Sequence, residues 1–125
     1  MSSILLIDDE PQMRELYDRI LTRAGYDVVT ACDGYEGVQC FQTRPVSLVI
    51  TDLLMPRQNG FETIRILRAL APTLKILVVS GWASVAPGVG LARVQNCGAD
   101  QVLQKPVSRE ALLTAVQDLL STGAT

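Results

Sequence analysis

Four apolar runs in this sequence each end at or near a residue whose side chain suits phosphoryl or metal chemistry. These residues are Asp8 and Asp9 after residues 4–7, Asp52 after residues 47–51, Ser80 after residues 75–79, and Lys105 after residues 101–103. Three carboxylates that come close together cannot all stay ionised without a counter-cation. Lys105 supplies one positive charge, and Mg²⁺ bound by carboxylates, phosphate oxygens and water suits the remainder.

A carboxylate held beside Mg²⁺ can act as a nucleophile and form an aspartyl-phosphate. The nucleophile should be the acid that is not committed to the metal through both oxygens. That condition points to Asp52, which stands alone after the central apolar run and precedes an open loop at residues 53–60. Ser80 and Lys105 would then stabilise the charge on the transferring phosphoryl oxygens.

Each of these residues has a structural explanation when it is taken alone. Asp9 could cap a helix that begins near Pro11, and Asp52 could be a turn residue. Ser80 could cap a helix, and Lys105 could be a solvated charge. Their joint placement after successive apolar runs favours the functional interpretation.

The elements that must position these residues alternate regularly along the chain. Strands are predicted at residues 4–7, 27–31, 47–51, 75–79 and 101–103, and helical periodicity follows each of the first three and the last. Residues 81–90 are ambiguous, because Pro87, Gly88 and Gly90 favour a loop or a short, delayed helix ending near Asn96. Ser108 is a plausible cap for the last helix. This alternation predicts an α/β domain with a parallel sheet, in which strand order 2-1-3-4-5 would bring Asp8, Asp9 and Asp52 together.

Length, composition and charge narrow the class of protein. The 125 residues fit one domain, 1–125, with a tail at 122–125 that is expected to fray. A net charge of −2 disfavours direct nucleic-acid binding, and the absence of histidine disfavours a zinc site. No apolar run approaches the ~18 residues that a membrane span needs, and the N-terminus does not resemble a signal peptide. We therefore expect a cytoplasmic domain without membrane insertion.

The motifs together resemble the receiver domains of two-component response regulators along essentially the whole chain. The matching pieces are Asp8-Asp9, the stretch DLLMPRQNG at 52–60, Ser80, and Gly98-Ala99-Asp100 before Leu103-Gln104-Lys105-Pro106. The resemblance implies a flavodoxin-like, doubly wound (βα)5 fold with helices on both faces of the sheet.

It also implies roles for single residues. Asp9, Asp52 and the backbone carbonyl of Leu54 would ligate Mg²⁺, with Asp8 assisting through water. Asp52 would accept a phosphoryl group from a histidine kinase or a phosphotransfer protein, and Ser80 and Lys105 would bind its oxygens. The Lys105–Pro106 peptide bond would be cis.

Three departures from the family pattern concern the steps after phosphorylation. Val102 stands where the family commonly has a switching Tyr or Phe. Gly81 and the Pro/Gly-rich segment at 87–90 interrupt the expected fourth helix, so we expect the switch to work by ordering of this loop. Leu54 and Trp82 occupy the two positions that tune the lifetime of the acyl phosphate in this family, and their apolar bulk predicts a shielded, long-lived phosphoryl group.

The predicted function is therefore that of a signalling phosphoacceptor rather than an enzyme. Phosphorylation would bias an inactive–active equilibrium that a partner protein detects through the fourth helix, the fifth strand and the last helix, or would feed a phosphorelay. The chain would be a monomer or a weak phosphorylation-dependent dimer. Two alternatives stay open: a constitutive pseudo-receiver, and an Asp-nucleophile phosphohydrolase, which would usually carry a second acid where Leu54 stands.

Overall fold

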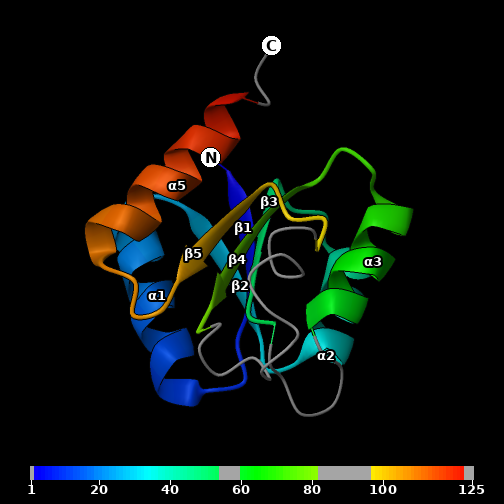
Figure 1. Ribbon diagram of the computed structural model, residues 1–125, viewed down its shortest axis with the longest axis horizontal. Coiled ribbons are helices and arrows are strands. Elements are labelled where there is room, and N and C mark those ends of the chain that lie inside the picture. The colour runs from blue at the N-terminus through cyan, green and yellow to red at the C-terminus, as the bar shows by residue number, and fades with distance from the viewer. Residues whose placement is uncertain (1, 54–59, 82–96, 123–125) are drawn as a thin grey trace.

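Five parallel strands form one sheet in the order β2-β1-β3-β4-β5 (Figure 1). The structure is a computed structural model that describes residues 2–53, 60–81 and 97–122. The elements in chain order are β1 (Ser3–Ile7), α1 (Pro11–Arg23), β2 (Asp27–Ala31), α2 (Gly34–Thr43), β3 (Leu48–Thr51), α3 (Gly60–Leu70), β4 (Lys75–Ser80), β5 (Gln101–Gln104) and α5 (Arg109–Thr122). The predicted strand order is confirmed. The segment predicted as a broken fourth helix lies outside the described residues.

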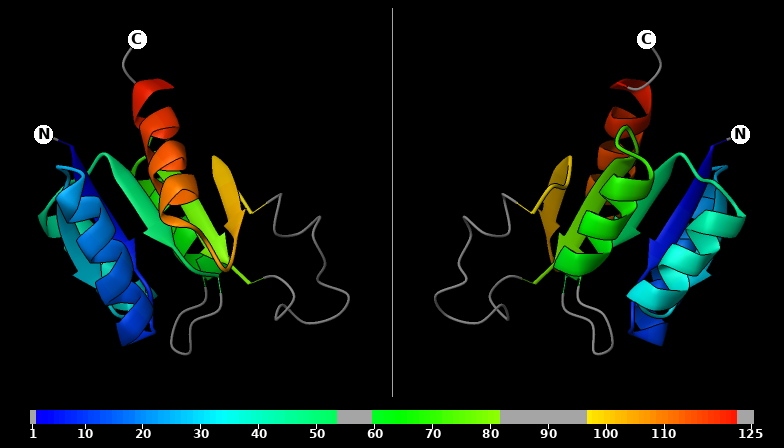
Figure 2. Two further views of the ribbon diagram at one scale, coloured as in Figure 1. Left: turned by 90° about the vertical axis from the view of Figure 1, so that its left-hand side faces the viewer. Right: turned by 90° about the vertical axis from the view of Figure 1, so that its right-hand side faces the viewer.

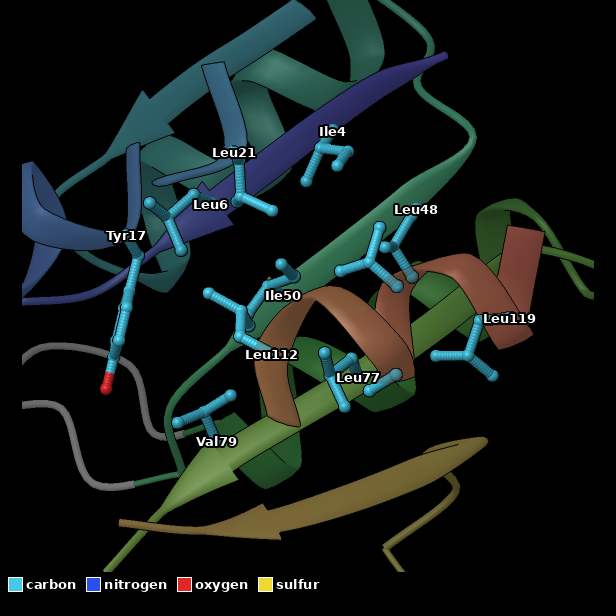
Figure 3. Close-up of a cluster of buried hydrophobic side chains, with 12 residues drawn as sticks. Ile4, Leu6, Tyr17, Leu21, Leu48, Ile50, Leu77, Val79, Leu112 and Leu119 are labelled. Atoms are coloured by element: carbon cyan, nitrogen blue, oxygen red, sulfur yellow. The ribbon is translucent and has the colours of Figure 1, made fainter. Parts of the chain in front are cut away.

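The helices cover both faces of the sheet, as the resemblance implied (Figure 2). On one face α1 and α5 pack over a cluster that includes Leu6, Ile50 and Leu77 (Figure 3). On the other face α2 and α3 pack over a cluster that includes Ile7, Val49 and Val78. The central strands β1, β3 and β4 are buried almost throughout, because side chains on both faces of each strand meet a helix layer.

The predicted apolar helix faces are wider than the faces that the structure buries. Leu16, Tyr35 and Leu70 fall on the apolar period of α1, α2 and α3, yet they are 44%, 54% and 47% exposed. Periodicity identifies the stripe but not how much of its width meets the sheet.

The helix ends follow capping chemistry with one exception to the predictions. The Ser108 hydroxyl accepts a hydrogen bond from the Ala111 amide, which confirms the predicted cap of α5. Asp33 caps α2 by accepting from the Glu36 amide. Asp9 does not cap α1: the cap position belongs to Glu10, without a side-chain bond, and Pro11 is the first helical residue. The Asp9 side chain is thereby left for other contacts. Thr122, predicted to belong to the frayed tail, is the last residue of α5, and residues 123–125 lie outside the described residues.

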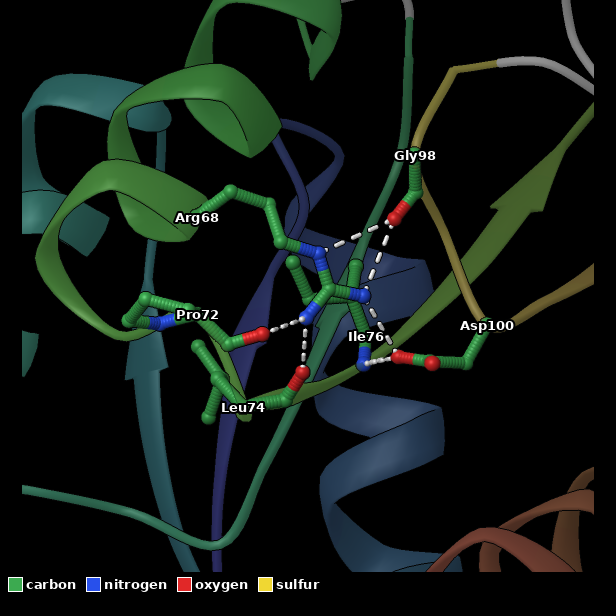
Figure 4. A network of polar contacts seen from close by, with 6 residues as sticks. All are labelled: Arg68, Pro72, Leu74, Ile76, Gly98 and Asp100. Carbon is green, nitrogen blue, oxygen red and sulfur yellow. Dashed lines mark hydrogen bonds and ion pairs between the residues drawn. The ribbon is translucent and has the colours of Figure 1, made fainter.

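One arginine ties the end of α3 to the start of β5 (Figure 4). The Arg68 guanidinium donates to the carbonyls of Pro72, Leu74 and Gly98 and to the Asp100 carboxylate, 2.7 Å away. The same Asp100 oxygen accepts from the Ile76 amide at 2.8 Å. Asp100 therefore aligns β5 beside β4. The register of β5 in turn determines the position of Lys105, which follows the carboxyl end of this strand.

None of the described helices combines the length and the apolar character that crossing a bilayer requires.

Candidate phosphoacceptor site

Backbone hydrogen bonds bring the carboxyl ends of four strands level with one another. The Asp52 amide donates to the Ile7 carbonyl, and the Lys105 amide donates to the Ser80 carbonyl at 3.0 Å. Asp8 and Asp9 therefore stand beside Asp52, and Lys105 stands beside Ser80, at one edge of the sheet. This is the edge where open α/β sheets bind their ligands.

Asp8, Asp9 and Asp52 form the acidic cluster that the sequence predicts. One carboxylate oxygen from each lies within 4.8 Å of one from each of the others. Asp8 and Asp52 are only 3% and 7% exposed. Oxygen donors packed this closely suit a hard divalent cation, so the residues present fit Mg²⁺.

Lys105 is the cation that faces this cluster. Its Nζ lies 2.7 Å from Asp52 Oδ2, 3.6 Å from Asp8 Oδ2 and 3.8 Å from Glu10 Oε1. Burial alone would lower the pKa of Lys105, but the hydrogen bond to Asp52 and the charges of Asp52 and Asp8 outweigh burial and raise it. The ammonium is therefore held in its charged form directly over the Asp52 carboxylate.

Within the cluster, the carboxylate form of Asp8 is disfavoured. Burial raises the pKa of Asp8, and the charges of Asp52 and Asp9 add to the rise, whereas the Glu10 amide and Lys105 oppose it. The Glu10 amide donates to Asp8 Oδ1 at 2.9 Å, and Arg14 Nη1 donates to the Asp8 carbonyl at 2.7 Å. These contacts fix the carboxylate in place without neutralising it.

Ser80 lies at the end of β4 with its hydroxyl enclosed. The residue is 0% exposed, and its Oγ has no hydrogen-bond partner among the described residues. The Lys105–Pro106 peptide bond is cis, as the resemblance implied. Ser80 and Lys105 thus stand on adjacent strands beside the acidic cluster.

Of the three residues predicted to affect the steps after phosphorylation, the structure describes only Val102. Val102 is partly buried and packs against the cluster on the α2–α3 face of the sheet. Leu54 and Trp82 lie outside the described residues, as do residues 55–59.

The sequence analysis missed three residues that the structure places in or against this site. Glu10 Oε1 lies 3.8 Å from Lys105 Nζ, and Tyr17 of α1 is buried in the apolar cluster that includes Val79, near the end of β4. Gly60, the first residue of α3, lies so close to the Asp52 backbone that a Cβ atom would stand 2.2 Å from the Asp52 carbonyl oxygen. The Asn59-Gly60 pair indicates a turn or the entry to a helix, and Gly60 does begin α3, but the pair gives no sign of this close approach to the preceding strand end.

A parallel sheet of order 2-1-3-4-5 with three acids and a lysine at its carboxyl edge defines the class of CheY-like phosphoacceptor folds. The family model described as "Response regulator receiver domain" matches residues 4–117. The chain belongs to this family.

Known proteins resemble the chain in sequence and in structure. The transcriptional regulatory protein GlrR of Escherichia coli (strain K12) is 34% identical over 97% of this chain, which covers 27% of that protein. A receiver domain of a histidine kinase from Syntrophus aciditrophicus superposes with a TM-score of 0.90 at 27% identity, covering 99% of this chain and 93% of that one. The response regulator TrrA of Thermotoga maritima, solved in complex with Mg²⁺ and BeF, superposes with a TM-score of 0.83 at 30% identity, covering 95% and 99% of the two chains. The chain spans between 27% and 50% of the length of the curated relatives it matches.

Proposed function

We propose that Asp52 accepts a phosphoryl group from a histidine kinase or a phosphotransfer protein. One observation carries the proposal: Lys105 Nζ lies 2.7 Å from Asp52 and 3.6 Å from Asp8, in a cluster that also includes Asp9. A structural ion pair would need one acid and one base. Three acids gathered around a single lysine leave negative charge that either a further cation or protonation of one acid must balance, and a divalent cation leaves all three as anions.

The residues of the site divide the transfer between them. An Asp52 oxygen attacks the phosphorus atom, the bond from phosphorus to the donor nitrogen breaks, and the donor imidazole leaves with its electron pair. Lys105 moves onto a phosphoryl oxygen, and the Ser80 hydroxyl, which has no partner among the described residues, donates to another. When bound by Asp9, Asp52, the Leu54 carbonyl and, through water, Asp8, Mg²⁺ would supply positive charge against the same oxygens.

Phosphorylation would act on a partner protein by shifting an existing equilibrium. The group adds roughly −1.5 to −2 charge at the edge of the sheet, and it favours the state in which Ser80 and Lys105 contact it. β5 carries Val102 where the family commonly has a switching aromatic residue. We therefore propose that ordering of the segment after Ser80 transmits the change to the surface formed by β5, α5 and that segment. Leu54 and Trp82 would shield the acyl phosphate from water. The chain would act as a monomer or as a weak, phosphorylation-dependent dimer.

A test of this function measures capture of a phosphoryl mimic. Wild-type protein should bind one beryllofluoride per chain when Mg²⁺ is present, and should incorporate phosphate at Asp52 from a small acyl-phosphate donor. Asp52→Asn should do neither. Asp118→Asn, at an exposed acid of α5, should behave as wild type.

Other outcomes would identify a different function. A folded wild-type chain that captures neither group would be a pseudo-receiver. Sustained turnover of external phosphoesters, without a stable acyl phosphate, would indicate a phosphohydrolase.

A further inference from the structure

Two buried side-chain hydroxyls have no hydrogen-bond partner among the residues that the structure describes. One is Ser80 Oγ, whose proposed role is given above, and the other is the phenol oxygen of Tyr17. Tyr17 is 1% exposed, so its hydroxyl does not reach bulk water. A buried hydroxyl without a partner costs free energy that a phenylalanine at the same position would avoid.

Packing explains the ring of Tyr17 but not its hydroxyl. The ring lies in the cluster on the α1–α5 face of the sheet, together with Leu21, Leu112 and Val79. In Figure 3 the side chain runs obliquely to the strands, and its oxygen extends past Leu6 toward the side where Val79 lies. The hydroxyl is thus directed toward the carboxyl ends of the strands, where the acidic cluster and Lys105 are placed.

The surrounding charges indicate a partner for the hydroxyl. Burial raises the pKa of Tyr17, and among charged groups Lys105 acts on it most strongly, ahead of Asp8, Asp52 and Glu10. Tyr17 in turn belongs to the groups that act on the pKa of Lys105. Lys105 is therefore the charged group that acts most strongly on the phenol, and an ammonium donates hydrogen bonds and accepts none.

Lys105 has a partner now and will need a new one after phosphorylation. Its short bond is to Asp52 Oδ2, at 2.7 Å, while Asp8 and Glu10 lie at 3.6 and 3.8 Å. Once Asp52 becomes an acyl phosphate, its carboxylate charge is gone, and the ammonium must turn toward the phosphoryl oxygens. An ammonium has three donors, and one phosphoryl oxygen uses only one of them.

We propose that Tyr17 is a positioning residue for Lys105. Its phenol oxygen accepts a hydrogen bond from the ammonium when Lys105 leaves the free Asp52 carboxylate for a phosphoryl oxygen. The inference rests on the proposed function and deepens it. It explains why a hydroxyl that has no described partner in the unphosphorylated chain stands at this point of the core. Lys105 becomes its hydrogen-bond partner only when the phosphoryl group is present.

The test compares Tyr17→Phe with Tyr26→Phe, which removes a phenol hydroxyl from a partly buried tyrosine of the same cluster. Tyr17→Phe should weaken beryllofluoride binding and slow phosphorylation by a small acyl phosphate by roughly tenfold, the value of one charged hydrogen bond. Its affinity for Mg²⁺ alone and its resistance to urea should equal or exceed those of wild type. Tyr26→Phe should leave beryllofluoride binding unchanged.

A second measurement asks whether Tyr17 acts through Lys105. In tyrosine-labelled protein, the ¹³Cζ resonance of Tyr17 should shift on addition of beryllofluoride with Mg²⁺, whereas that of Tyr26 should not. The losses caused by Tyr17→Phe and Lys105→Arg should combine non-additively.

Equal beryllofluoride affinity in wild type and Tyr17→Phe would overturn the inference and leave the proposed function intact. Fully additive losses, or an unmoved Tyr17 resonance, would also overturn it. If wild type itself fails to bind beryllofluoride, the proposed function fails, and the inference fails with it.

Discussion

The buried carboxylate of Asp8 lowers the stability of the folded chain. The residue is 3% exposed, and burial together with neighbouring carboxylates raises its pKa above the ordinary value of 3.8. Folding therefore favours the neutral acid, although the proposed chemistry requires the anion. The residue is retained at a cost that a metal ion or a second cation would remove.

The substitution Asp8→Asn should raise the free energy of unfolding in metal-free buffer at neutral pH. Because the folded-state pKa is raised, the contribution of Asp8 to the free energy of unfolding should be largest when Asp8 is protonated. This contribution should fall as pH rises from about 3.8 through the folded-state pKa, and it should stay low above it. Urea unfolding across this pH range measures the effect, with Asp118→Asn as the control. The variant should lose part of this decline, whereas a variant less stable than wild type at pH 7 would contradict the electrostatic account.

At the scale of single residues, the sequence predicted the acids, the serine and the lysine but not their companions. Asp8, Asp9, Asp52 and Lys105 were recognisable because each stands after an apolar run. Tyr17 was not, because a tyrosine on the apolar stripe of a helix looks the same whether its hydroxyl meets solvent, a backbone carbonyl or a lysine. Which of these it meets depends on how far α1 sits along the sheet, a property of packing between distant segments.

At the scale of elements, the junction between β3 and α3 fixes the backbone that carries Asp52. The Gly60 amide donates to the Leu53 carbonyl at 2.8 Å, so α3 begins against the backbone that carries Asp52. A Cβ at Gly60 would stand 2.5 Å from the Leu53 Cα as well as 2.2 Å from the Asp52 carbonyl oxygen. These neighbours are backbone atoms, which cannot move aside without moving the acid.

We expect Gly60→Ala to lower the free energy of unfolding by about 1–3 kcal/mol, the range for overpacking a close-packed site. It should also weaken beryllofluoride binding, because the backbone of Asp52 must shift. The matched control is Gly37→Ala in α2, where the added Cβ meets only the Ile7 side chain. If Gly37→Ala proved as damaging to beryllofluoride binding as Gly60→Ala, the close approach to Asp52 would not be the cause.

Strands and helix positions were predictable because each has a local signal, whereas the contacts that join them were not. Ser108 marks the beginning of α5, and Gly25, which follows α1, has the positive φ, 101°, that a glycine at the end of a helix typically adopts. The bonds from Arg68 to Gly98 and Asp100 span some 30 residues of chain, and nothing near Arg68 in the sequence announces them.

At the scale of the whole molecule, the sheet gathers three carboxylates at one edge, and the cation that they face there among the described residues is Lys105. The apolar layers on both faces supply the stability that allows this concentration of like charge. A ligand that binds the folded edge and not the unfolded chain returns free energy to the folded state by mass action. Mg²⁺ should therefore act on the stability of the entire domain and not on the site alone.

Magnesium at a hundred times its dissociation constant should raise the free energy of unfolding by about 2.7 kcal/mol. Asp9→Asn should abolish most of this gain, because it removes one of the three clustered oxygen donors, while Asp118→Asn should keep it. Urea unfolding with and without Mg²⁺, at ionic strength matched with KCl, separates specific binding from screening. A gain of equal size in wild type and Asp9→Asn would place the ion elsewhere, because a cation that does not depend on Asp9 cannot be balancing the acids around Asp52.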